Sequence, residues 1–333
     1  MLDLKSLENK KVLFITTKNL DYIRNTQEIE LLRQNARELK VLGSLKKSYP
    51  IRLLLVYFRL LTMSMKPYDV VFIGFSPQLV LPFWGWRFRK KIVGIDFFIS
   101  VYDTMVCDRK KFRDGGVLSG LCRWLDRKTL RRSDFCVCDT NAHGDYFSTE
   151  FGVPREQFHT LYLKADTSIY YPRKVEKPQE VKNRFVVLYF GSVLPLQGIE
   201  VITDAMRALA EDERLFFYFI GPVPEQIQAS NIRYIDWLPQ KELAEHIAFA
   251  DLCLAGHFRA DIGKARRTIP GKAYIYRAMN KPMILGDNPA NRELFTDKTE
   301  GIYFVPMGNA SALKERILEI YEERCAADST HLN

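Results

Sequence analysis

Residues 184–209 read RFVVLYFGSVLPLQGIEVITDAMRAL, and this stretch is the strongest indication of the fold class. An apolar run typical of a buried strand ends at Gly191, a loop follows, and Gly198 opens an amphipathic segment. A glycine at a strand end and another at a helix start let backbone N–H groups approach a phosphate. A plain strand–turn–helix, in which the glycines serve only the chain geometry, fits the same residues. The stretch predicts a parallel α/β unit, with a phosphate-binding turn as the sharper interpretation.

Strand-like and helix-like segments alternate on both sides of this stretch, which is typical of parallel sheets. Buried strands are expected at residues 12–17, 69–74, 91–96, 134–140, 159–163, 184–191, 214–221, 250–256, 282–287 and 301–306. Helices are expected at residues 25–38, 119–131, 142–151, 199–209, 239–249, 270–279 and 310–324. A polar, lysine- and proline-bearing segment at 170–183 has the composition of a linker. The sequence therefore predicts two doubly wound, Rossmann-like domains, 1–170 and 171–333, which face a central ligand-binding cleft.

The net charge of +9 is divided unevenly along the chain. Residues 1–170 hold 28 Lys and Arg against 18 Asp and Glu, whereas residues 171–333 hold 21 against 22. A basic half attracts phosphorylated partners or anionic lipid. Residues 81–91, LPFWGWRFRKK, mix cations with tryptophan, which suits a membrane surface better than a nucleic-acid groove. We therefore expect an anionic membrane surface, and no nucleic acid, as a partner of the N-terminal domain.

Two further features bear on the location of the protein. Residues 50–65, PIRLLLVYFRLLTMSM, are apolar almost all round and predict either a core helix or a helix at a lipid interface. The N-terminal residues lack a signal-peptide cleavage site, and no window of about 18 residues is apolar enough to span a membrane. The six cysteines show no zinc-type spacing and are expected to be buried thiols. The expectation is a cytoplasmic protein associated peripherally with the inner face of the cell membrane.

Two segments of the C-terminal half suit an anionic ligand. Residues 264–272, KARRTIPGK, gather four cations where a proline opens a helix, so that the helix dipole and the cations together would hold a diphosphate. A solvated basic loop is the alternative. Residues 282–294, PMILGDNPANREL, place Glu293 on a helix just after a strand end, where it would take ribose or sugar hydroxyls, or be a surface glutamate.

The N-terminal half offers carboxylates for catalysis. Asp96 and Asp103 bracket FFISVY just past a strand end, where a carboxylate could orient or deprotonate an acceptor hydroxyl. A helix-capping role is the alternative for each. His143 lies near a helix start and is a weaker candidate on the acceptor side, with a structural role as its alternative. No pair of aspartates has a convincing DxD context, so we expect neither a required metal nor a cofactor.

These segments together resemble a known family. YFGSVLPLQGIEVI, FYFIGPVPEQ, NIRYIDWLPQKELAEHIAFADLCL and KARRTIPGKAYIYRAMNKPMILGDNPANRELF resemble the C-terminal domain of glycosyltransferase family 4, the group 1 transferases. The resemblance is continuous over residues 184–321, and residues 95–112 and 139–147 resemble a bacterial subgroup more loosely. It implies a GT-B fold, an acceptor-binding first domain and a second domain that binds a nucleotide-sugar. It also implies synthesis of cell-surface polysaccharide or glycolipid, often on a lipid-linked acceptor, with retention at the anomeric carbon.

The chain departs from the family pattern at several positions. The family usually has Arg after the first glycine and Lys before the second, both on the donor diphosphate, where this chain has Ser192 and Gln197. Two family glutamates that contact the donor sugar and ribose align with Arg267 and Ile275. In place of a glycine-rich turn after the first strand, TTKNLDYIRN supplies Arg24 and Asn25 on the acceptor side. The expected donor-binding residues are Gly191, Ser192, Gln197, Gly198, Lys264, Arg267, Lys272 and Glu293.

Three functions are compatible with this pattern. The first is a glycosyltransferase that takes a nucleotide-sugar as co-substrate and transfers the sugar to a lipid-linked or saccharide acceptor. The second is a catalytically silent homologue that binds and regulates a partner transferase, which the replacements Ser192, Gln197 and Ile275 favour. The third is a GT-B nucleotide-sugar epimerase, which would need a histidine and carboxylate set facing the donor. The first is the predicted function.

Overall fold

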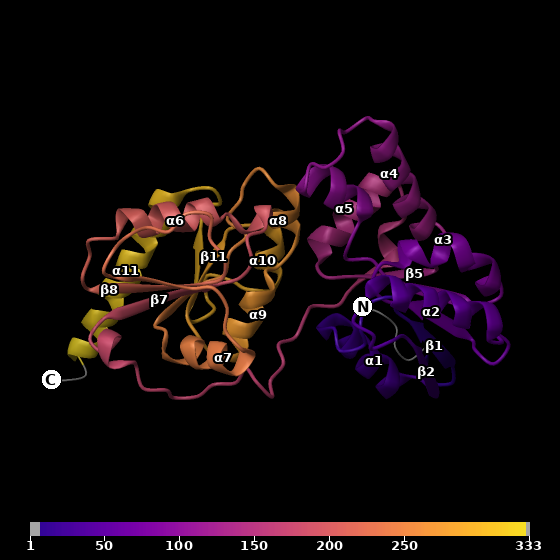
Figure 1. The fold of residues 1–333 in the computed structure, drawn as a ribbon, viewed down its shortest axis with the longest axis horizontal. Coiled ribbons are helices and arrows are strands. Elements are labelled where there is room, and N and C mark those ends of the chain that lie inside the picture. Colours follow the sequence, from indigo (N-terminus) through magenta and orange to yellow (C-terminus); the bar gives the residue numbers. More distant parts are fainter. Residues whose placement is uncertain (1–6, 331–333) are drawn as a thin grey trace. The chain divides into compact units, whose positions relative to one another are not determined.

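The structure, a computed structural model, describes residues 7–330, with side chains through residue 326. The chain divides into two compact units, residues 1–163 and 164–333, so the division falls seven residues before the expected one. Each unit contains a six-stranded sheet in which all paired strands are parallel, flanked by helices (Figure 1). The two doubly wound α/β domains that the alternating pattern predicts are therefore present.

The N-terminal sheet has the strand order β2-β1-β3-β4-β5-β6. Its strands are β1 Lys11–Ile15, β2 Glu38–Leu42, β3 Val70–Ile73, β4 Ile92–Asp96, β5 Phe135–Cys138 and β6 Phe158–Thr160. Its main helices are α1 Ile23–Asn35, α2 Tyr49–Thr62, α3 Leu81–Trp84, α4 Val117–Leu130 and α5 Asn141–Phe151, with a short 3-10 helix η3 at Gly85–Phe88 and a π-helical segment η4 at Asp103–Asp108. The chain reverses its direction of travel across the sheet between β1 and β3. In doubly wound sheets, the carboxyl ends of strands at such a reversal form the usual ligand site.

Side chains alternate between the two faces of this sheet and build two hydrophobic clusters. One face, with Leu13, Val71 and Ile95, packs against α2, α3, α4 and α5. The other face, with Phe14 and Phe72, packs against α1. The helices α2, α3 and α4 therefore form one layer on one side of the sheet.

The C-terminal sheet repeats the plan with the order β12-β11-β10-β7-β8-β9, so its reversal lies between β7 and β10. Its strands are β7 Phe185–Phe190, β8 Leu215–Ile220, β9 Ile232–Ile235, β10 Leu252–Leu254, β11 Met283–Gly286 and β12 Ile302–Val305. Its helices are α6 Ile199–Ala208, α7 Gln240–Phe249, α8 Gly263–Arg267, α9 Gly271–Ala278, α10 Pro289–Leu294 and α11 Ala310–Thr330. Helices α6 and α11 share one hydrophobic cluster with the sheet (Figure 1). Ring contacts of Tyr218 with Phe249 and of Phe190 with Tyr276 bring α7 and α9 against the opposite face.

Several local predictions were wrong. Strands β2 and β9 were not predicted, because both lie at sheet edges and their partly exposed residues lack a strong apolar run. Residues of α8 were expected to be a loop but form a short helix. Cys107 and Cys325 are exposed rather than buried.

Helix α2 covers most of residues 50–65, for which the sequence predicted either a core helix or a helix at a lipid interface. Of its residues, only Arg52, Val56 and Leu60 are buried. Leu54 and Phe58 are 67% and 63% exposed, so the helix is not enclosed in the core. In the described residues, no helix is both long enough and apolar enough to cross a membrane.

Candidate functional site

A buried lysine lies at the carboxyl edge of the C-terminal sheet. Lys272 is the second residue of α9, and it is only 6% exposed. Its Nζ donates a hydrogen bond to Gln197 Oε1 at 2.6 Å and lies 3.4 Å from the Tyr189 hydroxyl. The amine also lies 4.5 Å from the centre of the Tyr189 ring. These residues come from the end of β7, the loop before α6 and the start of α9, and so they meet at the reversal point between β7 and β10.

Two glycines give the lysine its room. A Cβ on Gly191, whose φ is +148°, would lie 3.1 Å from Lys272 Nζ. A Cβ on Gly256, whose φ is +81°, would lie 2.3 Å from Gln197 Oε1 and 3.1 Å from Lys272 Nζ. Side chains at either position would therefore fill the space around the amine. We call Tyr189, Gly191, Gln197, Gly256 and Lys272 the Lys272 site.

The amine of Lys272 has no counter-ion among the described residues. In the described residues, no carboxylate lies within ion-pair distance of its amine, and burial lowers the pKa of Lys272 to about 7. A buried amine without a counter-ion is costly in its charged form. An anion bound beside it would remove that cost, so the site has the chemistry of an anion receptor.

The other expected donor residues surround this site to different degrees. Gly198, with φ of +67°, approaches the backbone of Phe258 so closely that a Cβ would lie 2.8 Å from its carbonyl carbon. Ser192 is exposed in the loop after β7. Lys264 and Arg267 lie on α8, and Glu293 lies on α10, whose cap residue Asn288 hydrogen-bonds to the Ala265 carbonyl of α8. The structure thus brings Gly191, Gln197, Gly198 and Lys272 together and places Lys264, Arg267 and Glu293 on two neighbouring helices.

The expected acceptor-side residues Arg24 and Asp96 form a buried ionic cluster in the N-terminal domain. Arg24 and Asp96 are each 1% exposed, and Arg24 Nη2 lies 3.0 Å from Asp96 Oδ1. Arg24 Nε lies 3.3 Å from both Asp96 oxygens and 3.4 Å from Glu28 Oε1. Burial raises the pKa of Asp96, although the neighbouring Arg24 lowers it, and burial with the Asp96 charge raises the pKa of Glu28 well above its usual value. Asp96 and Arg24 therefore lie in the interior of the domain, where each is the ion-pair partner of the other.

Asn25 and His143 are also enclosed. Asn25 hydrogen-bonds to Thr16 and to the carbonyl of Asn19, and it is fully buried. His143 is fully buried, and its Nδ1 lies 2.6 Å from Asp139 Oδ1. Burial alone would raise the pKa of Asp139, but His143 and Arg24 together lower it. Asp139 follows β5, its side chain is 15% exposed, and the sequence pattern did not single it out.

Asp103 stays a catalytic prediction. It is 1% exposed at the start of η4, and its Oδ1 accepts a hydrogen bond of 3.4 Å from the Tyr146 hydroxyl. In the described part of the chain, no three His, Cys, Asp or Glu side chains gather as a metal site would require.

The sequence analysis also did not predict a group of four side chains at the carboxyl edge of the N-terminal sheet. Lys18 and Tyr22 follow β1, Phe75 follows β3 and Phe98 follows β4. The Tyr22 and Phe75 rings are 5.6 Å apart, and Phe75 lies 6.1 Å from Phe98. Lys18 Nζ lies 5.0 Å from the centre of the Phe75 ring. All four side chains are partly exposed, at the reversal point of the N-terminal sheet; we call them the aromatic platform.

Comparison with known proteins agrees with this architecture. The fold resembles that of HepE from Anabaena in complex with UDP and glucose, with a TM-score of 0.61, 14% identity and coverage of 95% of this chain and 91% of that one. It also resembles sucrose-phosphate synthase from Thermosynechococcus elongatus, with a TM-score of 0.64, 12% identity and coverage of 94% and 90%. These similarities confirm the predicted GT-B fold for the chain.

The sequence comparisons concern the C-terminal domain. Residues 184–323 match the family described as glycosyl transferases group 1. Over 153 residues the chain is 30% identical to the probable glycosyltransferase WbjE of Pseudomonas aeruginosa, and this segment spans 43% of the chain and 37% of that relative. The C-terminal domain is therefore similar in sequence to the group 1 glycosyl transferases, in agreement with the resemblance found from the sequence alone.

Proposed function

We propose that the protein transfers a sugar from a nucleoside-diphosphate sugar to a lipid-linked or saccharide acceptor, in the synthesis of cell-surface polysaccharide or glycolipid. The observation that carries this proposal is the Lys272 site, an uncompensated amine at the reversal point of a group 1 glycosyl transferase domain. HepE, a structural neighbour, is described in complex with UDP and glucose. UDP-sugars are therefore the first donors to test.

The site suits the departure of a diphosphate. When the bond between the anomeric carbon and the diphosphate oxygen breaks, that oxygen gains negative charge. The acceptor hydroxyl oxygen forms the new bond to the anomeric carbon, and its proton passes to the released diphosphate. A preorganised cation beside the leaving oxygen stabilises this charge. Lys272 supplies the positive charge that Ser192 and Gln197 lack, while Gln197 Oε1 fixes the position of its amine. The donor thus provides the anion that the buried lysine is missing.

The aromatic platform is the proposed acceptor surface. Partly exposed rings such as Tyr22 and Phe75 present flat apolar faces on which the C–H face of a sugar ring stacks, and Lys18 adds a cation for a phosphate. Thr17 Oγ1 lies 3.1 Å from the hydroxyl of Tyr49, the first residue of α2, so the platform adjoins the start of that helix. The exposed apolar side of α2 extends from it and suits the hydrocarbon part of a lipid-linked acceptor.

The location proposed for this reaction is the cytoplasmic face of the cell membrane, with the protein held peripherally through its basic N-terminal domain. The excess of Lys and Arg over Asp and Glu in residues 1–170 supports this location, as do the exposed apolar residues of α2. The resemblance of the C-terminal domain to its family favours retention at the anomeric carbon. Proton NMR of the first product formed would give the anomeric configuration directly.

The test is a thermal-shift panel of UDP, GDP, CDP and their sugars, followed by donor consumption with a membrane extract as the source of acceptor. A ligand at about 100 times its dissociation constant adds about 2.7 kcal/mol of stability, which such a panel detects. Nucleotide binding with transfer supports the proposal. Nucleotide binding without transfer from any donor would favour a silent, regulatory homologue, the function that Ser192 and Ile275 leave open. Isomerisation of the donor in the absence of acceptor would indicate an epimerase.

A further inference from the structure

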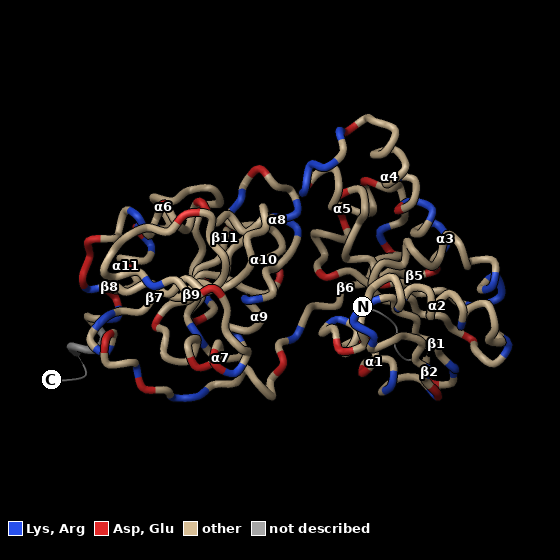
Figure 2. Tube along the Cα trace, viewed as in Figure 1, with Lys and Arg blue, Asp and Glu red and all other residues tan. Residues whose placement is uncertain are grey.

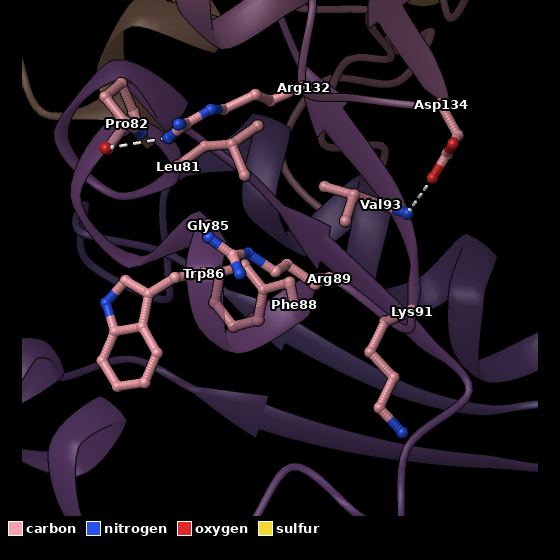
Figure 3. Close-up of a pocket in the computed structure, with 10 residues that line it drawn as sticks. All are labelled: Leu81, Pro82, Gly85, Trp86, Phe88, Arg89, Lys91, Val93, Arg132 and Asp134. Atoms are coloured by element: carbon pink, nitrogen blue, oxygen red, sulfur yellow. Dashed lines mark hydrogen bonds between the residues drawn. The ribbon is translucent and has the colours of Figure 1, made fainter.

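Two neighbouring pockets lie at the opposite, amino-terminal edge of the N-terminal sheet. The first has a volume of about 340 Å³ and lies between η3 and the turn that joins α4 to β5 (Figure 3). The second has a volume of about 290 Å³ and lies along the last turns of α4. Arg132 lines both, so the two pockets adjoin each other. We call them the amino-edge pockets.

The first pocket has an apolar floor and a cationic rim. Leu81, Phe88 and Val93 are at most 4% exposed and form the floor. Arg89, Lys91 and Arg132 line the pocket around them (Figure 3). Its single carboxylate, on Asp134, accepts the backbone N–H of Val93 at 2.7 Å. Three cations therefore face one carboxylate that already has a partner.

The second pocket adds more positive charge. Its lining consists of Trp124, Arg127, Lys128, Arg131 and Arg132, with no acidic residue among them. Lys128 Nζ lies 4.2 Å from the centre of the Trp124 ring. The pocket therefore joins cations to an aromatic side chain that is 50% exposed.

None of the cations of the amino-edge pockets forms an ion pair within residues 7–326. Arg132 Nη1 donates to the Pro82 carbonyl at 3.0 Å, and Lys91 Nζ donates to the carbonyls of Tyr68 and Lys66. Carbonyl oxygens orient a cation but leave its charge uncompensated. Six cations of this kind around two adjoining hollows create a positive potential that attracts an anion.

The apolar surroundings decide which anion fits. Trp86, which is 56% exposed, lines the first pocket (Figure 3), and Phe83, which is 59% exposed, belongs to the preceding helix α3. Helices α2 and α4 belong to the same layer of helices. That layer also exposes Ile51, Leu54, Leu55, Phe58, Leu61, Val117, Leu118, Leu121 and Trp124. Binding to nucleic acid is strengthened by cations but not by exposed leucines, whereas binding to a bilayer interface is strengthened by both cations and tryptophan.

We propose that the amino-edge pockets bind the phosphate headgroups of anionic phospholipids, with Trp86 and Trp124 at the bilayer interface. The proposal deepens the membrane location given under the proposed function and rests on it. The pockets lie at the edge of the sheet opposite to the aromatic platform, because β4 and β5 begin at one and end towards the other. A bound phospholipid therefore leaves the acceptor surface free.

The experiment measures partition of the full chain onto vesicles of phosphatidylcholine, with and without phosphatidylglycerol. A double variant, Arg89→Gln with Arg131→Gln, removes two cations that make no side-chain hydrogen bond in the described residues. Its control, Arg33→Gln with Arg37→Gln, removes the same charge from the region of α1, which packs on the other face of the sheet. Because each cation near an anionic surface contributes about a factor of five, the pocket variant should lose about 25-fold in partition and the control less than about 3-fold.

Equal losses in the two double variants would overturn the proposal, because net charge alone would then explain binding. Release from vesicles by inorganic phosphate, at constant ionic strength, would overturn it in favour of a free-phosphate site. Binding to duplex DNA with the same sensitivity to Arg89 and Arg131, and none to vesicles, would overturn it in favour of nucleic acid. A further readout is quenching of tryptophan by brominated phosphatidylglycerol, which Trp86→Phe with Trp124→Phe should abolish. Retained quenching in that variant would contradict the placement of both rings.

Nucleotide binding by the same variants separates this proposal from the proposed function. We expect both double variants to bind UDP as the unaltered protein does. Loss of vesicle binding with intact nucleotide binding concerns the amino-edge pockets alone. Vesicle binding that depends on Arg89 and Arg131, in a protein that binds no nucleotide, would uphold the pockets and refute the donor site.

Discussion

The two domains share one sheet plan but distribute their charges in opposite ways. In the C-terminal domain, partly exposed arginines such as Arg259, Arg292 and Arg316 pair with nearby carboxylates, whereas the buried Lys272 has no ion-pair partner in the described residues. In the N-terminal domain, the buried cation Arg24 is paired, and the cations of the amino-edge pockets are exposed without an ion pair in the described residues. Figure 2 shows Lys and Arg in blue along both domains.

This difference between paired and unpaired cations indicates where anionic ligands are expected to bind. A charge that has its counter-ion within the protein contributes to the fold, and an exposed pair contributes little. A cation without a counter-ion in the protein can bind an anion that a ligand supplies. We therefore propose a small enclosed anion site in the second domain and a broad basic surface that contacts anions on the first.

The largest effect is expected from breaking the paired interior of the N-terminal domain. Arg24→Met leaves Asp96 buried without its partner, and removal of one member of a buried pair costs about 3–5 kcal/mol. Urea unfolding of the N-terminal domain measures this loss. Arg33→Met, an exposed change on the same helix, is the control and should cost less than about 0.5 kcal/mol. Equal costs for the two variants would show that the interior pairing of Arg24 is unimportant.

Within the same cluster, Glu28 should behave differently from Arg24. Burial raises the pKa of Glu28, so its carboxyl keeps its proton to a higher pH than an ordinary glutamate does. Glu28→Gln therefore replaces a group that is already neutral over that range. We expect a smaller loss of unfolding free energy than for Arg24→Met, and a larger one would mean that Glu28 is ionised.

The uncompensated lysine of the C-terminal domain should dominate turnover. Lys272→Ala removes the cation beside the leaving diphosphate and should lower turnover by about 10²–10³. Lys241→Ala, an exposed lysine at the start of α7, is the matched control and should leave turnover unchanged. Donor consumption measures both. Full activity of the Lys272 variant would separate catalysis from the Lys272 site.

The same lysine makes donor binding depend on pH. Burial lowers the pKa of Lys272 to about 7 in the empty protein, and a diphosphate favours the charged amine. Above pH 7 the donor must therefore bind with uptake of a proton, and affinity should fall by up to about tenfold per pH unit. Because the folded chain binds fewer protons than the unfolded chain between pH 7 and 10.5, this group raises stability with pH in that window. Lys272→Met should flatten both profiles, and unchanged profiles would refute the assignment.

The smallest effect is expected at the paired surface of the C-terminal domain. Arg316 and Glu319 lie 2.7 Å apart on α11 and are both partly exposed. Arg316→Ala should change the free energy of unfolding by less than about 0.5 kcal/mol. A loss above about 1 kcal/mol in urea unfolding would show that surface pairing does more for this domain than the comparison assumes.

The sequence predicted the architecture because buried parallel strands carry long apolar runs, as RFVVLYFG does before Gly191. It could not predict β2 or β9, whose edge positions need no such run. The sequence predicted Lys272 as a donor-binding residue, because this lysine belongs to a cluster of cations at a helix start. It did not predict that the amine reaches Gln197, because that contact joins residues 75 positions apart through the fold.

Burial in the structure distinguishes the predicted site residues that are enclosed from those that are accessible. Asp96 and His143 follow strand ends or begin helices, where sequence patterns favour catalytic residues, yet their partners Arg24 and Asp139 hold them inside the domain. A local pattern places a residue near a strand end but does not say whether its side chain points to solvent. The aromatic platform escaped prediction for the same reason, because its residues come from three separate loops.

The most direct test of the donor site is calorimetric titration of the full chain with UDP, GDP and CDP at pH 8, in two buffers of different ionisation enthalpy. We expect binding of at least one diphosphate at a single site, with net uptake of protons, and loss of both the uptake and most of the affinity in Lys272→Met. No binding of any of the three would contradict it, and so would a Lys272→Met variant that binds as tightly as the unaltered protein.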